Sequence, residues 1–318
     1  MQSVFRFRTT LAAVAALLLP LTASACTGSV PAAEAPALSV GAVPETAPGA
    51  VPDETTDPLA GRDAQLLSAA LDEYAAGMGA EVSAAVYDSS TGGTWYYNRD
   101  GRYLEASLVK VPILLTLLRQ ATEEGRSLTE DEEYLAALMI EYSDNPSTTA
   151  LYESVGGPEE LSRTYELLGV SGTEATETWG ANDTGVEDQL KIARAVAEGV
   201  DWIDEDLHSF AVGLMENVDA GQRWGISAGV GDTGAEIALK NGWLPDDTLA
   251  WNVGSTGFVR SDAAEYSIVV LTSGALTMDD GVSVVEEAAR MINSFQSPAT
   301  DATGPGPDRV WRAGGPDA

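Results

Sequence analysis

Ser107 and Lys110 have the types and the spacing of a nucleophile and its base. They lie in the run EASLVKVPILLTLL at 105–118, whose apolar pattern predicts a helix. Residues three apart lie on the same helical face, so the amine can approach the serine oxygen. A helix N-terminus favours developing negative charge, and a desolvated lysine can lose its proton near neutral pH. The pair indicates acyl transfer through a serine ester, although an ordinary helix with a basic residue in its first turn fits the same letters.

Histidine is the usual base beside a catalytic serine, and this chain contains only His208. The string Gly-Ile-Ser-Ala-Gly at 225–229 has the form of the nucleophile elbow of many esterases. That elbow requires a histidine later in the chain and a helix after the serine, and the following residues GVGDTGAE provide neither. We therefore interpret Ser227 as unconnected with catalysis, and His208 as a partly buried packing or capping residue.

Two further motifs occur later in the chain. Of the three lysines, a second one opens Lys-Asn-Gly at 240–242, on a predicted strand and directly before Trp243. Between the two lysines lies Ser-Asp-Asn at 143–145, after one helical run and before another. Ser-x-x-Lys, Ser-Asp-Asn and Lys-x-Gly in this order resemble the motifs of the penicillin-recognising serine hydrolases, closest to class A β-lactamases. The resemblance covers about 62–296.

The resemblance implies a role for residues of the first two motifs. Ser107 would be the acylated nucleophile, Lys110 the base that activates it, and Ser143 the group that relays a proton to the leaving nitrogen. Asn145 would hold the side-chain amide of the substrate. Taken by itself, the Ser-Asp-Asn triplet fits a helix cap equally well.

The third motif, by the same resemblance, would bind the substrate. Lys240 would supply positive charge near the relay serine and the substrate carboxylate, and the backbone N–H groups of Ser107 and Trp243 would form an oxyanion hole. Gly242 would let the substrate lie against the strand. Asn241 replaces the usual Thr or Ser, so an amide would have to donate to the carboxylate, and recognition would be altered. Taken by itself, Lys240 fits a solvated strand residue.

Two stretches are shorter than in the family. Ser107 and Ser143 are closer in sequence than in well-studied β-lactamases, which predicts a smaller helical lobe and a more open site. The segment 169–190 lacks the Glu-x-x-Leu-Asn pattern that carries the water-activating glutamate. Either Glu174 or Glu177 could act as the base for deacylation, or both could be exposed loop carboxylates in a very acidic protein.

The elements expected around these motifs form a fold of the α/β (α+β) class. Apolar residues at helical spacing predict a helix at 63–77 and another at 283–295. Residues typical of β-structure predict two early and three late strands, at 81–88, 92–98, 235–242, 248–259 and 265–274. This order predicts a β-lactamase/transpeptidase-like body: a five-stranded, mainly antiparallel sheet flanked by N- and C-terminal helices, with an inserted helical lobe.

The ends of the chain have a different composition. Two arginines, an apolar run and small residues precede Cys26, which predicts a signal peptide at 1–25 and lipidation of Cys26, with a plain secretory signal as the alternative. The Pro- and Ala-rich stretch 26–61 predicts a disordered tether before the domain at 62–296, and 297–318 a disordered tail. We expect a protein anchored at the extracellular face of a bacterial membrane, or a secreted one if Cys26 is not lipidated.

Charge and composition limit the partners. A net charge of −32, from 17 basic and 49 acidic residues, argues against nucleic acid. With one histidine and one cysteine, only carboxylates remain as metal ligands, and they lack the spacing of a calcium loop. We therefore expect a monomer without metal or other cofactor, whose partner is a small-molecule β-lactam or a peptidoglycan peptide.

Three functions fit these observations. The first is hydrolysis of a β-lactam amide through a Ser107 acyl-enzyme, with slow deacylation. The second is a D-alanyl-D-alanine peptidase or penicillin-binding protein that acts on peptidoglycan stem peptides. The third is a non-catalytic wall-binding lipoprotein that keeps the pocket for recognition only.

Overall fold

A computed structural model describes residues 61–231, 234–262 and 264–296. The predicted signal peptide, Cys26, the tether up to residue 60 and the predicted tail lie outside these ranges, so the assignments made for them stay predictions. Within the described ranges, no helix has both the length and the apolar character needed to span a membrane.

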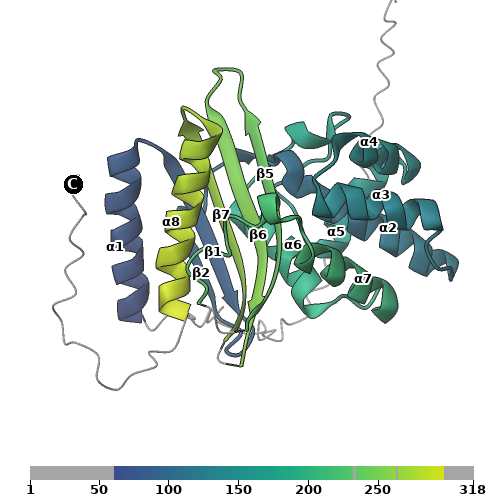
Figure 1. The fold of residues 1–318 in the computed structure, drawn as a ribbon, viewed down its shortest axis with the longest axis horizontal. Coiled ribbons are helices and arrows are strands. Elements are labelled where there is room, and N and C mark those ends of the chain that lie inside the picture. Colours follow the sequence, from purple (N-terminus) through teal and green to yellow (C-terminus); the bar gives the residue numbers. More distant parts are fainter. Residues whose placement is uncertain (1–60, 232–233, 263, 297–318) are drawn as a thin grey trace, which may run out of the picture. The chain divides into compact units, whose positions relative to one another are not determined.

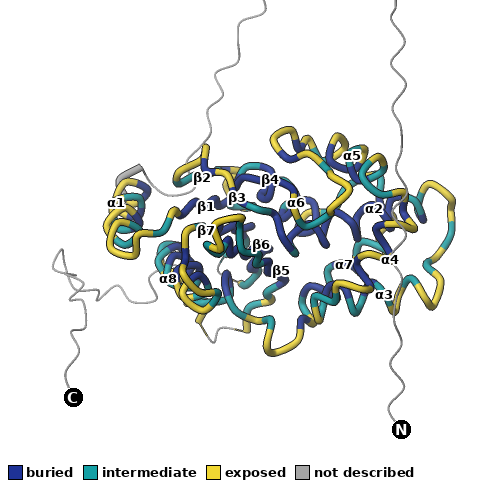
Figure 2. Tube along the Cα trace, turned by 90° about the horizontal axis from the view of Figure 1, so that it is seen from above, coloured by how far each residue is buried: buried dark blue, intermediate teal, exposed yellow. Residues whose placement is uncertain are grey.

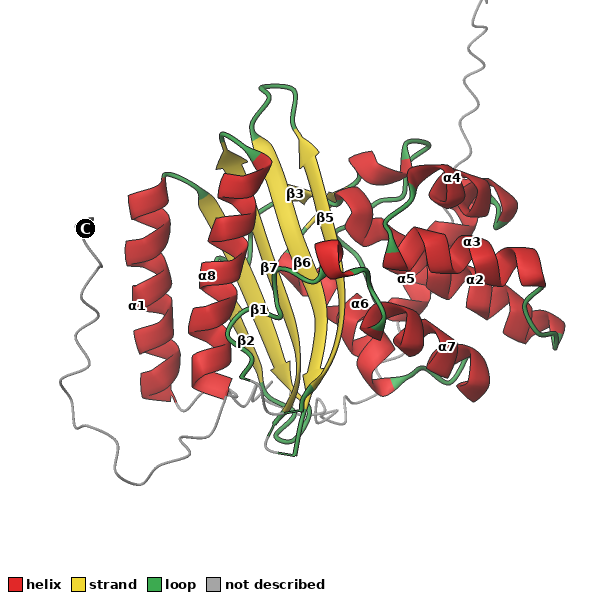
Figure 3. Cartoon of the chain, in the orientation of Figure 1, coloured by secondary structure: helices red, strands yellow, loops and turns green. Residues whose placement is uncertain are grey.

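The sheet contains five antiparallel strands in the order β2-β1-β7-β6-β5. As predicted, two come from the N-terminal part of the body and three from the C-terminal part: β1 (Glu81–Asp88), β2 (Thr94–Tyr97), β5 (Glu236–Pro245), β6 (Trp251–Arg260) and β7 (Glu265–Ala275). Most residues of β6 and β7 are buried, because helices cover both faces of the sheet (Figure 3). β5 is an edge strand, so alternate main-chain groups along it point away from the sheet.

Two helices from opposite ends of the body cover one face of the sheet. α1 (Gly61–Met78) and α8 (Met278–Gln296) lie side by side, and α8 contacts β6 and β7 (Figure 1). Leu67 and Leu71 of α1 are fully buried, as are Val285 and Ile292 of α8. Spacings of four and seven residues place each pair on one face of its helix, and these faces form a core with the sheet.

The predicted helical lobe lies between β2 and β5 in the chain. It consists of α2 (Lys110–Glu124), α3 (Glu130–Glu141), α4 (Asn145–Ser154), α5 (Gly157–Leu168), α6 (Val186–Glu198) and α7 (Glu205–Glu216). α2 is its centre, since α3, α4, α5 and α7 all contact it. α6 packs on β1, β6 and β7 and joins the lobe to the sheet, where Figure 2 shows buried segments gathered.

Local signals end and begin the helices near the motifs. α2 ends at Gly125, whose φ of 64° is left-handed and favours glycine. Thr129 begins α3 through a capping box with Glu132. The Asp144 side chain caps α4 by accepting a hydrogen bond from the Ser147 N–H. The triplet at 143–145 therefore occupies the bend between α3 and α4.

A short ladder brings a distant loop to the start of α2. β3 (Tyr103–Leu104) pairs with β4 (Asp183–Thr184), and the single turn η1 (Ala106–Val109) follows β3. η2 (Trp179–Ala181) contacts η1. We call residues 170–185 the capping loop, because they pack against the turn that carries Ser107.

Candidate active site

Ser107 lies on η1, directly before α2. Ala106 takes a φ of 49°, which is unusual for a residue with a side chain and bends the backbone sharply ahead of the serine. Ser107 is half-buried, whereas Ala106, Leu108 and Val109 are buried. The turn therefore leaves Ser107 as its most accessible residue.

Lys110 is the first residue of α2 and is fully buried. Its Nζ bonds Ser143 O at 2.7 Å, Ser143 Oγ at 3.0 Å and Asn145 Oδ1 at 2.8 Å. The amine also lies 5.3 Å from the centre of the Trp179 ring. Burial lowers the pKa of Lys110 to about 7, and the charge of Asp144 opposes that shift. Much of the amine is therefore neutral at physiological pH and able to accept a proton.

The Ser-Asp-Asn triplet forms the helix cap that its sequence allowed, and its two other residues contact Lys110. Asp144 caps α4 through its carboxylate, which leaves the residues on either side of it for other contacts. Ser143 has a φ of 58°, a left-handed conformation, and bonds Lys110 through both its carbonyl and its hydroxyl. Asn145 reaches the same amine. The cap thus fixes the geometry of a polar cluster around Lys110.

Lys240 approaches the same serine from β5. Its Nζ donates to Ser143 Oγ at 3.0 Å and to Asn241 O at 2.9 Å. Only 1% of Lys240 is exposed, so the alternative of a solvated strand residue is wrong. Burial, together with the charge of Lys110, holds the pKa of Lys240 well below its usual value. One hydroxyl, Ser143 Oγ, therefore joins two buried amines.

The edge strand β5 runs directly over the turn that carries the nucleophile. A Cβ on Gly242 would lie 3.0 Å from Ser107 N and 2.9 Å from Leu108 N. Only a residue without a side chain fits at this distance. The next residue, Trp243, is half-buried, and its ring lies 5.9 Å from that of Trp224. The backbones of Ser107 and Gly242 therefore lie close together.

Asn241 faces the loop before β5 rather than open solvent. Its Nδ2 donates to Gln222 O at 2.6 Å and to Trp224 O at 3.1 Å, and the residue is only 1% exposed. Both N–H bonds of the amide are thereby directed to main-chain carbonyls. A substrate carboxylate would have to displace one of them or find another donor.

Glu174 and Glu177 are exposed residues of the capping loop. The loop is held by neighbouring polar residues: Asp188 accepts hydrogen bonds from Ser171 N and Gly172 N, and Asn182 Oδ1 accepts one from Thr176 N. Among the contacts of the described residues, none joins either glutamate to the three motifs. Trp179, which sequence reasoning passed over, is the loop residue that reaches Lys110.

A second residue that sequence reasoning missed is Glu105, two positions before the nucleophile. It is fully buried, and its carboxylate accepts hydrogen bonds from Tyr165, Asn182 and Gln189. Burial raises its pKa to about 7, while these hydrogen bonds act in the opposite direction. An acidic residue followed by an apolar run was the available signal.

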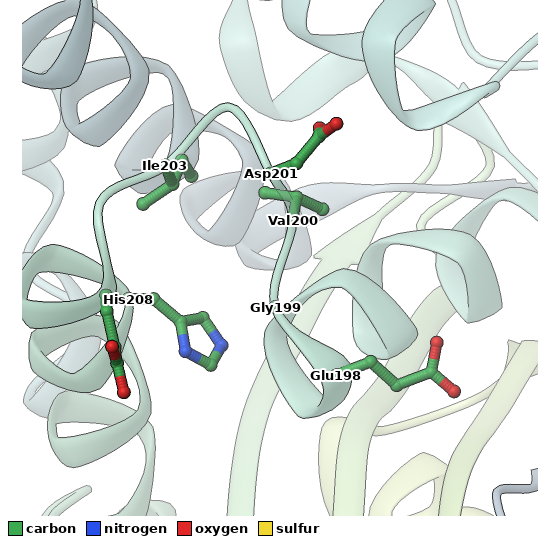
Figure 4. Close-up of a pocket in the computed structure, with 7 residues that line it drawn as sticks. Glu198, Gly199, Val200, Asp201, Ile203 and His208 are labelled. Carbon is green, nitrogen blue, oxygen red and sulfur yellow. The ribbon is translucent and has the colours of Figure 1, made fainter.

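His208 lies on α7, away from the motifs in sequence, and lines a pocket of about 400 Å³ with Glu198, Gly199, Val200, Asp201, Ile203 and Glu205 (Figure 4). Its Nε2 donates to Val196 O at 2.7 Å, in the last turns of α6. Of the two roles predicted for His208, packing or capping, this hydrogen bond supports capping. In the part of the chain that the structure describes, no cluster of three or more His, Cys, Asp or Glu side chains is arranged to hold a metal ion.

The fold and the site together define a class of protein. An antiparallel sheet with terminal helices on one face, an inserted helical lobe and two buried lysines around one serine hydroxyl are features of the penicillin-recognising serine hydrolases. The sequence model of the "Beta-lactamase enzyme family" matches residues 66–135 and 131–296. This chain belongs to that family, which confirms the resemblance drawn from the three motifs.

Similar proteins include both lipoproteins and enzymes by name. LppW of Mycobacterium tuberculosis, named as a lipoprotein, is 25% identical over 235 residues, which are 71% of this chain and 72% of LppW. A variant of PBP-A, solved as an acyl-enzyme complex with penicillin G, has 19% identity and a TM-score of 0.61, over 73% of this chain and 95% of that one. The TLA-3 extended-spectrum β-lactamase has 15% identity and a TM-score of 0.66, over 73% and 98%. At these identities the solved structures show a shared fold.

Proposed function

We propose that this protein is a serine hydrolase that opens a β-lactam amide by forming an ester at Ser107, and that releases this ester slowly. The observation that carries the proposal is the cluster in which Lys110 Nζ and Lys240 Nζ both lie 3.0 Å from Ser143 Oγ. Burying two amines around one hydroxyl costs free energy because each amine loses its hydration, and a catalytic role would explain why the fold retains this arrangement.

Acylation would begin with Lys110 as the base. The neutral amine takes the hydroxyl proton of Ser107, and Ser107 Oγ attacks the lactam carbonyl carbon. The carbonyl oxygen becomes an oxyanion, which the N–H groups of Ser107 and Trp243 would bind. The closeness of Gly242 to Ser107 N supports this placement.

Collapse of the tetrahedral intermediate breaks the carbon–nitrogen bond, and the leaving nitrogen needs a proton. Ser143 Oγ can donate its own proton and recover one from Lys110, to which it is already bonded. The hydrogen bond from Lys240 keeps Ser143 Oγ in place during this transfer. Asn145, which bonds Lys110, would also meet the side-chain amide of the substrate.

The placement of the carboxylates near the site supports slow release of the ester. Hydrolysis of the ester requires a water molecule and a base positioned beside it. Glu174 and Glu177 are exposed on the capping loop, and Glu105 is fully buried with three donors on its carboxylate. This arrangement also favours the second candidate, a penicillin-binding protein or D-alanyl-D-alanine peptidase acting on stem peptides, for which a β-lactam is a lasting inhibitor.

Mass spectrometry during exposure to a chromogenic cephalosporin tests the proposal. An adduct on Ser107 that disappears as coloured product accumulates supports slow β-lactamase activity, and a lasting adduct supports the second candidate. Ser107→Ala must abolish the adduct in both cases. Intact, unmodified wild-type protein would contradict both and leave a wall-binding lipoprotein.

We also propose a lipid anchor at Cys26, which lies outside the described residues. Small residues before the cysteine and the lipoprotein name of the relative LppW support it. A radioactive fatty acid should label the full chain in its bacterial host, and Cys26→Ser should remove the label. Equal labelling of both chains would contradict lipidation, and export would then rest on a plain secretory signal.

A further inference from the structure

Glu105 lies directly before the turn that carries the nucleophile and has no role in the chemistry proposed above. It belongs to the link between β3 and η1, and none of its surface is exposed. The carboxyl group of a glutamate is rarely buried completely unless it is paired. Because Glu105 lies two residues before Ser107, its burial bears on the geometry of the active site.

The partners of Glu105 come from three different elements. Tyr165 of α5 donates its hydroxyl to the carboxylate at 3.0 Å, and Gln189 of α6 donates Nε2 at 3.0 Å. Asn182 of the capping loop donates Nδ2 at 2.8 Å. All three donate, and an ionised carboxylate is a pure acceptor, so the surroundings match the charged form.

The main chain of Glu105 repeats the same connection. Its N–H donates to Asn182 O at 2.8 Å, and its carbonyl accepts from the N–H of Leu108 at 3.1 Å. Asn182 in turn accepts from Thr176 N and Oγ1 through its own side-chain oxygen. Glu105 therefore bonds the capping loop through both its backbone N–H and its side chain, and it bonds the nucleophile turn through its backbone carbonyl.

The turn held in this way is strained. Ala106, between Glu105 and the nucleophile, has a φ of 49°, a conformation that persists only where the surroundings fix it. The same turn sets the direction of the Ser107 N–H, the donor next to Gly242. A small rotation of the turn would move this donor away from the position of a developing oxyanion.

We propose that Glu105 is a positioning residue, whose carboxylate ties the nucleophile turn to the capping loop and thereby aligns the Ser107 N–H for acylation. This inference rests on the proposed function. Glu105 is not a base for the ester, because both of its oxygens accept hydrogen bonds and its surface is fully covered. The charge of Asp188 also acts on Glu105 and favours its protonated form, so the experiment is set at pH 8 to keep Glu105 ionised.

Glu105→Gln tests the proposal with its shape almost unchanged. The new amide would replace one carboxylate oxygen by an NH₂ group, which would face the donor of either Asn182 or Gln189, and the tie would weaken. At saturating chromogenic cephalosporin, the acylation rate constant should fall about 10- to 100-fold, which is less than the rate loss caused by removing one oxyanion donor completely. The half-saturation concentration should stay within about threefold of wild type. Tyr165→Phe, which removes one donor and keeps the ring, should also lower the acylation rate constant, but by less than Glu105→Gln does.

Asp188→Asn is the matched control. Asp188 is also nearly buried and also holds the capping loop, through Ser171 N, Gly172 N and Thr173 Oγ1, and among the described residues none of its hydrogen bonds reaches the nucleophile turn. Its acylation rate should stay within about threefold of wild type. Hydrogen exchange gives a second readout, because the Leu108 amide should exchange faster in Glu105→Gln, whereas Asp188→Asn should affect the amides of Ser171 and Gly172.

The outcomes separate this proposal from the function on which it rests. No adduct on the wild-type chain would count against acylation at Ser107, while exchange at Leu108 would still test the tie. Folded Glu105→Gln with wild-type acylation and exchange would overturn the positioning role. An equal loss in Asp188→Asn would reduce it to general loop stability. Normal acylation with slower release would assign the carboxylate to ester hydrolysis instead.

Discussion

Gly242→Ala adds a single carbon where the structure leaves no space. The new Cβ would lie 2.9 Å from Leu108 N, 3.0 Å from Ser107 N and 3.1 Å from Glu105 O, whereas ordinary contacts of a Cβ begin at 3.4 Å. All three neighbours are main-chain atoms, so no rotamer change relieves the contact. β5 and η1 must move apart by a few tenths of an ångström.

This displacement acts on the two donors of the proposed oxyanion hole. Complete loss of one such donor costs about 10²- to 10³-fold in rate, and the shift misaligns both Ser107 N and Trp243 N without removing either. We therefore expect acylation to slow about 100-fold, together with a loss of about 1–3 kcal/mol in the free energy of unfolding from overpacking. Stopped-flow acylation by a chromogenic cephalosporin and urea unfolding measure the two effects.

Gly213→Ala is the matched control, in the last turn of α7. Beyond the backbone of its own helix, no atom of the described residues lies within 4 Å of the position that the added methyl group would take. Alanine in a helix is also favoured over glycine by up to about 1 kcal/mol. This variant should acylate at the wild-type rate with equal or higher stability. If folded Gly242→Ala acylates within about threefold of wild type, the N–H groups of Ser107 and Trp243 do not bind the oxyanion.

Three further predictions concern charge. The acylation rate should rise with pH through about 7, because burial lowers the pKa of Lys110 to about 7 and the neutral amine is the base. Asp144→Asn keeps the helix cap but removes a charge that raises the pKa of Lys110, so this rise should move to lower pH. A stopped-flow pH profile that does not move would speak against Lys110 as the base. Burial raises the pKa of Glu105 from 4.5 to about 7, so the folded state binds this proton more tightly than the unfolded state and stability falls as pH rises between these values, by about 3 kcal/mol. Urea unfolding at pH 5 and pH 8 should show this fall in wild type and a smaller one in Glu105→Gln; equal falls would contradict the assignment. Asn241→Thr should raise the preference for a carboxylate-bearing β-lactam over its methyl ester by about 10-fold, measured as the ratio of their half-saturation values. The reason is that a hydroxyl replaces an amide whose two N–H bonds are already used. An unchanged ratio would place the substrate carboxylate elsewhere.

The fold and the family were predictable because their signals are local or ordered along the chain. Residues typical of β-structure predicted β1 and β2, and apolar helical spacing predicted α1 and α8. The order of two early strands, helices and three late strands then allowed few arrangements. The three motifs predicted the family because each needs a specific residue at a specific spacing, and their joint occurrence is far rarer than any single one.

The capping loop could not be predicted in the same way. Glu174 and Glu177 were candidates because they are carboxylates in this loop. The loop residues that make contacts near the nucleophile are instead Trp179, which contacts Lys110, and Asn182, which contacts Glu105, each about 70 residues away in the chain. Such contacts depend on how the loop packs, and no periodicity encodes them. Glu105 escaped notice for the same reason, because an isolated acidic residue before an apolar run becomes meaningful only when its three donors are seen together.

The two buried lysines also determine how the pH dependence of acylation must be interpreted. Lys110 and Lys240 share the hydroxyl of Ser143, and the charge on Lys110 lowers the pKa of Lys240. Groups coupled in this way titrate as a pair, so the pH at which acylation rises belongs to both amines. A ligand carboxylate near Lys240 would favour its ammonium form, and the added positive charge would in turn disfavour protonation of Lys110. Because the ligand carboxylate offsets that charge, the pH at which acylation rises should be compared between anionic and neutral substrates before it is assigned to Lys110.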